Sequence, residues 1–245
     1  MSFGPLRPHR FLLSQCARVR RGADILKRRF VKRTDNFVNG TSVQSALREL
    51  RPRVARNSAQ PIHPLRLCRE LRDVMPRDAI LCVDGQEILN FARQAIPTFL
   101  PGHRLNSGTF GTMGVGLPLG LGAKTARPDA PVIVLHGDGS FGMNAMEIDT
   151  LVRHRLPVLV VISLNGGWTG DPDRERPGRD LAYTPYDRMA EALGAVGEQV
   201  DHPDDIRPAL ERGLAAVAEG RVALVNVVTD WRARATTAAF TRYVT

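Results

Sequence analysis

Two oxygen-bearing side chains, one an aspartate and the other an asparagine, are the strongest candidates for metal binding in this sequence. Asp138 lies in a Gly-Asp-Gly turn directly after one apolar run, and Asn165 follows the next apolar run along the chain. Magnesium takes about six oxygen ligands and usually only one or two carboxylates, with phosphate, carbonyl and water oxygens as the others. A carboxylate, a side-chain amide and a backbone carbonyl therefore match a Mg²⁺ ion that also holds a diphosphate.

The residues around these two turns predict one strand–helix–strand unit. Val132 to Leu135 is a short β-branched run, typical of a strand that is buried on both faces. Apolar residues recur at helical spacing over 145–153, and residues 156–164 resume as a second apolar strand. Because a right-handed crossover brings the ends of parallel strands to the same edge of the sheet, we expect Asp138 and Asn165 to be neighbours.

Small residues around Asp138 complete the predicted diphosphate site. Gly137 and Gly139 let the backbone approach a diphosphate closely, and the amides of Gly139, Ser140 and Phe141 are expected to point toward it from the start of a helix. A Gly-Asp-Gly turn alone is common without a metal ion. The interpretation therefore depends on the pairing of both turns across the whole unit.

The segment 137–167 resembles the cofactor-binding signature of thiamine-diphosphate enzymes, in which a GDG turn is followed by an asparagine-rich turn. In that family the Asp and the last Asn bind Mg²⁺ with a carbonyl two residues on. The resemblance thus implies Asp138, Asn165 and Gly167 as metal ligands. The usual Asn-Asn pair is absent because Leu164 stands first, but Asn165 matches the ligand. The similarity is closest to the branch of 2-hydroxyacyl-CoA lyase, oxalyl-CoA decarboxylase and acetolactate synthase.

A second segment, which begins at Ser107, resembles the part of the same family that binds the aminopyrimidine ring. By this resemblance Gly111 would offer its carbonyl to the exocyclic amino group. Met113 would be the apolar wedge that holds the cofactor in its bent conformation, a place that suits a flexible thioether. The two residues are therefore the catalytic candidates, and ordinary core packing is the alternative for Met113.

A third contact region follows the predicted strand Ile80 to Val83. The resemblance places Gly85, Gln86 and Glu87 near the diphosphate. A phosphate would repel the carboxylate of Glu87, so we expect this residue to contribute through its backbone amide.

Positive charge is concentrated in the N-terminal segment. The formal net charge is +9, and residues 1–57 contain 14 basic and three acidic residues, whereas the rest contains 20 basic and 22 acidic residues. We expect 1–57 to be an irregular, poorly ordered extension. A nucleic-acid-binding arm, a transit peptide and a merely solvated segment are the alternatives. Nucleic-acid binding is not favoured, because no interleaved aromatic residues or known binding motif accompany the charge.

The remaining composition is that of a soluble α/β domain. Hydrophobic residues make up 43% of the chain, and no apolar run reaches the roughly 18 residues that a membrane span needs. Cys16, Cys68 and Cys82 show neither metal-ligand spacing nor a disulfide framework. We therefore expect a cytoplasmic protein without membrane association.

The order of the predicted elements gives the domain organisation. Residues 58–230 alternate between strands and helices, which predicts a doubly wound, mostly parallel sheet flanked by helices, the thiamine-diphosphate-binding fold. Within it we expect helices over 61–76, 186–193 and 203–218, and a last strand over 221–230. The charged loop that begins at Trp168 is a candidate lid. The tail 231–245 resembles a segment that closes over the active site in the CoA branch, with a frayed terminus as the alternative.

The resemblance implies the thiamine-diphosphate- and magnesium-binding half of a carbon–carbon lyase or decarboxylase. Its substrates would be 2-hydroxyacyl-CoA or 2-oxo acid compounds, and the CoA thioester rests on the resemblance alone. The similarity covers residues 60–245, so we expect another chain to supply a pyrimidine-binding domain within a dimer or tetramer. The alternatives are a noncatalytic remnant that binds the cofactor weakly and a nucleic-acid-binding protein that acts through its basic arm.

Overall fold

The computed structural model of the chain describes residues 60–168 and 177–235. All of them belong to one contact unit of the chain, Glu49–Thr245. The predicted extension 1–57, part of the predicted lid and residues 236–245 of the tail lie outside the described residues. No helix in the described part is long and apolar enough to span a membrane.

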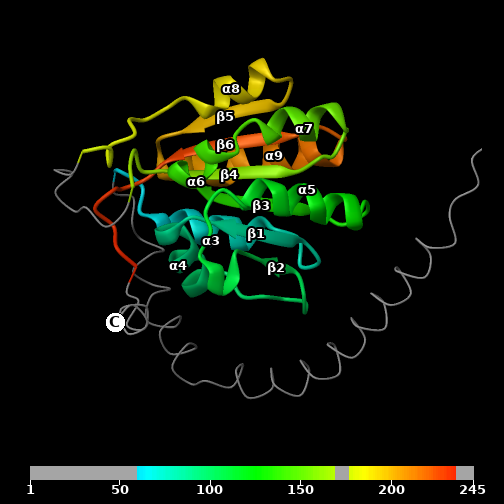
Figure 1. The fold of residues 1–245 in the computed structure, drawn as a ribbon, viewed down its shortest axis with the longest axis horizontal. Helices are drawn as coiled ribbons and strands as arrows, with labels where there is room; N and C mark the ends of the chain where they lie inside the picture. Colours follow the sequence, from blue (N-terminus) through cyan, green and yellow to red (C-terminus); the bar gives the residue numbers. More distant parts are fainter. Residues whose placement is uncertain (1–59, 169–176, 236–245) are drawn as a thin grey trace, which may run out of the picture. The chain divides into compact units, whose positions relative to one another are not determined.

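Six strands of the described residues form one parallel sheet with the order β2-β1-β3-β4-β6-β5 (Figure 1). The strands are β1 (Ile80–Asp84), β2 (Arg104–Leu105), β3 (Val132–Gly137), β4 (Leu159–Leu164), β5 (Val196–Val200) and β6 (Ala223–Val228). From β1 the chain runs outward to β2, and from β3 it runs in the opposite direction to β4. The gap between the ends of β1 and β3 is therefore the topological switch point, where open α/β sheets bind ligands.

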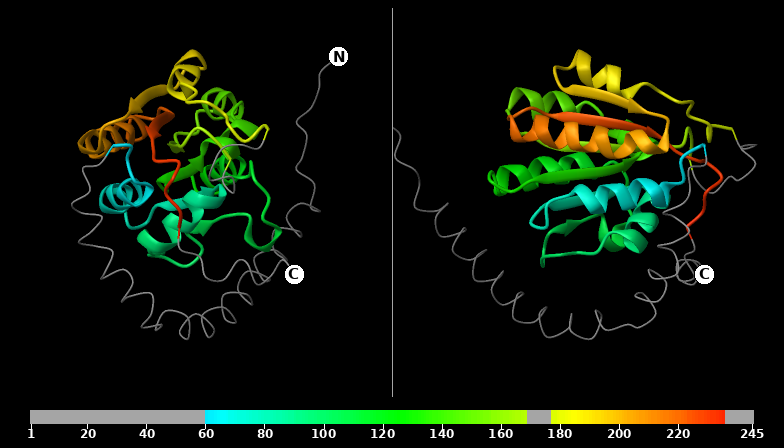
Figure 2. Two further views of the ribbon diagram at one scale, coloured as in Figure 1. Left: turned by 90° about the vertical axis from the view of Figure 1, so that its left-hand side faces the viewer. Right: turned by 180° about the vertical axis from the view of Figure 1, so that it is seen from behind.

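Helices cover both faces of this sheet, which confirms the predicted doubly wound α/β fold (Figure 2). One face carries α3 (Pro64–Val74), α4 (Gln86–Ala95) and α9 (Ile206–Ala218). The other carries α5 (Gly116–Ala126), α6 (Asp138–Met143), α7 (Glu147–Arg153) and α8 (Tyr186–Ala192). Two short 3₁₀ turns, Gly108–Phe110 and Pro203–Asp205, complete the described elements.

The central strands are apolar throughout because both of their faces are buried. On β3, Ile133 and Leu135 pack in the layer of α3, α4 and α9, whereas Val132 and Val134 pack in the layer of α5 to α8. All four side chains are at most 1% exposed. This two-sided burial explains why the strand appears in the sequence as a continuous apolar run rather than as an alternating one.

Several element bounds differ from the predicted ones, and the helix predicted over 61–76 is the shorter α3. The helix predicted over 145–153 is α7 alone, and a separate helix, α6, precedes it with a break at Asn144. Asn144 caps the end of α6, since its N–H donates to the carbonyl of Phe141 (3.1 Å), and its side chain donates a hydrogen bond to the carbonyl of Gly114 (2.5 Å). The helix predicted over 203–218 starts as a 3₁₀ turn before α9, and the two edge strands β2 and β5 were not predicted.

Candidate functional site

The predicted metal-binding turns meet at the carboxyl ends of β3 and β4. These two strands pair directly, with Gly137 opposite Ser163. Asp138 Oδ2 accepts hydrogen bonds from the backbone N–H of Gly166 (2.6 Å) and of Gly167 (3.1 Å). The side chain of Asp138 thus touches the turn that contains Asn165, as the strand–helix–strand unit predicted.

The Asp138 carboxylate is buried without a positively charged partner among the described residues. It is 3% exposed, and its Oδ1 accepts a hydrogen bond from the N–H of Gly139 (2.8 Å). Burial raises the pKa of Asp138 from 3.8 to about 6, although backbone hydrogen bonds from Gly139, Gly166 and Gly167 oppose that shift. No Lys or Arg in the described ranges forms an ion pair with it. A buried carboxylate in this state suits a bound cation.

Glycines bring the chain segments close together at the switch point. Gly85 has φ +108°, and a Cβ atom there would lie 3.0 Å from the backbone N of Gly137. A Cβ atom on Gly139 would lie 2.9 Å from the ring of Trp168. Only glycine fits both places, so the backbone itself forms the wall between the ends of β1 and β3.

A pocket with about 670 Å³ of empty space opens at this point. Asp138 and every predicted cofactor-binding residue except Gly111 line it, namely Gly85, Gln86, Glu87, Met113, Gly137, Gly139, Ser140, Asn165 and Gly167. A few polar groups that converge on a hollow lined by small residues are typical of small-molecule sites. Among the described residues, no three His, Cys, Asp or Glu side chains cluster as a metal site, so a ligand set here would need amide and carbonyl oxygens.

Gly111 and Met113 line a second hollow that adjoins the first. Gly85, Gln86 and Glu87 also line it, so the two hollows share one wall. Met113 is half-buried and belongs to both hollows, whereas Gly111 is exposed and has φ +64°. Met113 therefore borders both spaces, as Gly85, Gln86 and Glu87 do.

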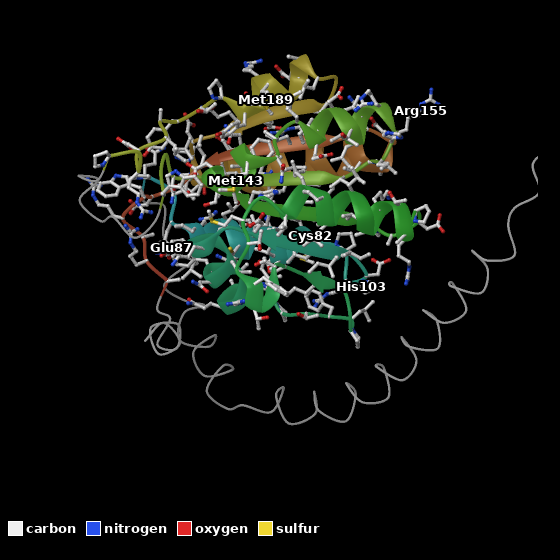
Figure 3. The ribbon with its side chains drawn as sticks, viewed as in Figure 1. Cys82, Glu87, His103, Met143, Arg155 and Met189 are labelled. Atoms are coloured by element: carbon white, nitrogen blue, oxygen red, sulfur yellow. The ribbon has the colours of Figure 1, made fainter. Side chains whose placement is uncertain are left out.

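Glu87 has a contact that the sequence did not predict. Its Oε2 accepts a hydrogen bond from the N–H of Ala235 (3.0 Å), 148 residues later in the chain. Asp230 and Ala233 also line the first pocket. The described start of the tail thus forms part of the pocket wall, and the Glu87 side chain faces the tail (Figure 3).

Trp168 and Arg179 are further pocket residues that sequence reasoning did not identify. Their backbones pair, since the N–H of Trp168 donates to the carbonyl of Arg179 (2.7 Å), and Gly167 bridges Asp180 in antiparallel fashion. The bulky indole after the Asn165 turn was the available signal, because an aromatic ring can cover a glycine-lined turn.

A parallel sheet with a glycine-lined pocket and a buried acid at its switch point defines an α/β protein of the nucleotide- and diphosphate-binding class. Residues 87–227 match the family model described as thiamine pyrophosphate enzyme, C-terminal TPP binding domain. The chain belongs to the thiamine pyrophosphate enzyme family, and the match covers its cofactor-binding domain. The predicted family is thereby confirmed.

Individual relatives agree with this family. The chain is 42% identical to a probable acetolactate synthase of Mycobacterium bovis over 69% of this chain and 32% of that protein. It is 39% identical to 2-hydroxyacyl-CoA lyase 2 of Caenorhabditis elegans over 70% of this chain and 29% of that protein. The solved thiamine diphosphate-dependent 4-hydroxybenzoylformate decarboxylase of Rhodococcus jostii RHA1 aligns with a TM-score of 0.64 and 26% identity, over 70% of this chain and 33% of that one. The chain spans about a third of the length of these curated relatives.

Proposed function

We propose that this chain is the thiamine-diphosphate- and magnesium-binding half of an enzyme that makes or breaks a carbon–carbon bond next to a carbonyl group. The observation that carries the proposal is the buried Asp138 carboxylate, which faces the Asn165–Gly167 turn in a pocket at the switch point. The family membership supports the cofactor, and the chemistry of the donor set supports the metal ion.

Three groups of residues would hold the cofactor. Asp138, Asn165 and the carbonyl of Gly167 would bind Mg²⁺. The turn backbone of Gly137, Gly139 and Ser140 would approach the diphosphate, as would the backbone of Gly85, Gln86 and Glu87. Gly111 and Met113, on the second hollow, would hold the pyrimidine ring. This division is supported by the two adjoining hollows that share the wall at Gly85.

The chain itself contributes charge and position. The Asp138 carboxylate supplies negative charge at a place from which water is largely excluded, so its attraction to a cation is strong. The glycine-lined backbone would fix where an anionic group can lie, and Met113 would contact the cofactor from the border of both hollows. Thiamine diphosphate supplies the carbanion chemistry when it is bound.

We further propose 2-hydroxyacyl-CoA or 2-oxo acid compounds as the substrate class. The names of the relatives support this choice, since they include 2-hydroxyacyl-CoA lyase 2 and a probable acetolactate synthase. A CoA thioester rests on the first of these similarities alone.

A pyrimidine-binding domain from another chain would complete the site, within a dimer or tetramer. The family match covers only the C-terminal domain of that family, which supports this proposal. Three exposed apolar side chains support it as well: Phe110, which precedes Gly111, is 92% exposed, and Met143 and Met146 are 51% and 63% exposed. In Figure 3, Met143 and Glu87 lie toward one end of the sheet, and His103 and Arg155 lie toward the other. Such side chains are typical of surfaces that bind a protein partner.

Calorimetry on the full chain tests the cofactor site. We expect thiamine diphosphate to bind only with Mg²⁺ present, and Asp138→Ala to abolish that binding because it removes the carboxylate. Asp149→Ala is the matched control, since this aspartate pairs with Arg153 on the surface of α7. Equal affinities of Asp138→Ala and wild type would contradict the assignment.

Reconstitution tests the enzymatic half of the proposal. Adding a pyrimidine-binding domain taken from a 2-hydroxyacyl-CoA lyase should produce turnover of a 2-hydroxyacyl-CoA. Tight cofactor binding without turnover, with domains from both the lyase and the synthase, would instead support a noncatalytic remnant.

A further inference from the structure

A buried polar cluster lies behind the pocket, on the side of α5 and α6. His136 is 1% exposed, Ser140 is 2% exposed and Asp84 is 3% exposed. His136 and Asp84 stand opposite each other on β3 and β1. Apolar side chains at these three positions would fill the same space without the cost of burying polar groups.

The hydrogen bonds of the cluster have a definite direction. The Ser140 hydroxyl donates to the carbonyl of Gly137 (3.0 Å), and its Oγ lies 3.1 Å from His136 Nδ1. With the hydroxyl hydrogen directed at the Gly137 carbonyl, Ser140 Oγ accepts from His136, and this arrangement places the imidazole hydrogen on Nδ1. Nε2 is buried and has no hydrogen-bond partner among the described residues.

The imidazole also contacts the start of α5. The N–H of Gly116 donates to Asp84 Oδ2 (2.8 Å), which lies 3.8 Å from His136 Nδ1. A Cβ atom on Gly116 would lie 2.4 Å from His136 Cε1 and 2.8 Å from the Cβ of Asp84. Glycine at 116 is therefore what makes room for the ring. His136 thus touches the end of β1, the start of α5 and the start of α6 at once.

These three contact points adjoin the three loops that line the two hollows. Asp84 precedes the wall residues 85–87, Gly116 follows the loop 111–113, and Ser140 ends the turn 137–140. We propose that His136 is a positioning residue for the cofactor: by donating from Nδ1 to Ser140 and packing on Gly116, it fixes the relative placement of these three loops. This inference rests on the proposed function.

Three substitutions separate the hydrogen bond from the packing. His136→Asn places an amide N–H near the position of Nδ1, His136→Gln places it near Nε2, and His136→Leu offers no donor. We expect the Gln and Leu variants to bind thiamine diphosphate with Mg²⁺ about tenfold more weakly, the effect of losing one hydrogen bond that orders the site. The Asn variant should stay within about threefold of wild type, because the donor to Ser140 is restored.

Ser140→Ala tests the same bond from its other end. It should weaken binding by at least the same factor, because it removes the bond to His136 and also the bond to the Gly137 carbonyl. Adding His136→Leu to it should change the affinity little further, because the bond to Ser140 is already lost. This variant keeps the test available if a His136 variant does not fold. Val134→Ala is the control for stability, since it cuts a buried side chain of the same strand and layer without touching the cluster.

The outcomes distinguish the inference from the proposed function. If wild type shows no Mg²⁺-dependent binding in calorimetry, the proposed function fails and the inference fails with it. If wild type binds and the Asn variant binds as weakly as the Leu and Gln variants, His136 is only a packing residue. The same conclusion follows if Val134→Ala loses as much affinity as a His136 variant of equal thermal stability. Recovery in the Asn variant alone supports the positioning role.

Discussion

The pH dependence of stability offers a quantitative test of the buried Asp138 carboxylate. Burial raises its pKa from 3.8 to about 6 in the cofactor-free protein. The folded chain therefore holds this proton more tightly than the unfolded chain. The resulting stabilisation is fully present below pH 3.8 and is lost as the pH rises through about 6.

The size of the effect follows from that shift. A change of about two pKa units corresponds to about 3 kcal/mol in the free energy of unfolding. Asp84 and His136 titrate in the fold as well, with a raised and a lowered pKa respectively, both caused mainly by burial. Their contributions cancel in the difference between wild type and Asp138→Asn, because both groups are present in each protein. The free energy of unfolding of wild type minus that of Asp138→Asn should therefore fall by about 3 kcal/mol between pH 3.5 and 7.

Urea unfolding followed by circular dichroism, at half-unit pH steps with EDTA and without cofactor, measures this difference. Asp149→Asn, on the surface of α7, is the control and should give a nearly flat difference. A flat profile for Asp138→Asn, or a difference that grows with pH, would show that the carboxylate is not desolvated in the way that its burial and contacts indicate.

Three further outcomes follow from local geometry. Gly116→Ala should lower the free energy of unfolding by about 1–3 kcal/mol, because the added Cβ would overlap His136. Gly122→Ala should raise it by about 0.5–1 kcal/mol, because no atom lies within 4 Å of the added Cβ. Urea titrations of both variants compare these two effects. Met113→Ala should reduce the turnover of the reconstituted enzyme by about tenfold or more while calorimetric affinity stays near wild type, and a loss of affinity alone would make it a packing residue. Cys68 and Cys82 should resist iodoacetamide at pH 8 until the chain unfolds, because burial raises the pKa of both thiols to about 12. Peptide mapping that finds either cysteine labelled in the native protein would contradict this prediction.

The sequence predicted the central strands and the convergence of the metal turns because both depend on local patterns. β1 and β3 are apolar on both faces, so they stand out as short β-branched runs, and the connection between β3 and β4 fixes where their ends meet. The edge strand β5 escaped prediction because VGEQV is only partly buried and contains a glycine and two polar residues. Sheet pairing with β6, rather than composition, makes it a strand.

The parts of the site that the sequence could not predict are long-range contacts. No local pattern links Glu87 to the amide of Ala235, because 148 residues separate them. The same holds for the Asp84–His136 pair, which becomes visible only when β1 and β3 are set side by side in register. Individual polar partners across a sheet depend on tertiary packing, and this explains why the family motif identified the turns but not the cluster behind them.

Trp168 gives the chain its own optical reporter. The sequence has two tryptophans, and the ring of Trp168 lies over Gly139 in the pocket wall, whereas Trp231 packs beside Arg232 near the tail. A ligand that enters next to Gly139 changes the polarity and mobility around the Trp168 indole. In a Trp231→Phe background, the emission intensity and wavelength of the single remaining fluorophore would follow the filling of the pocket in real time.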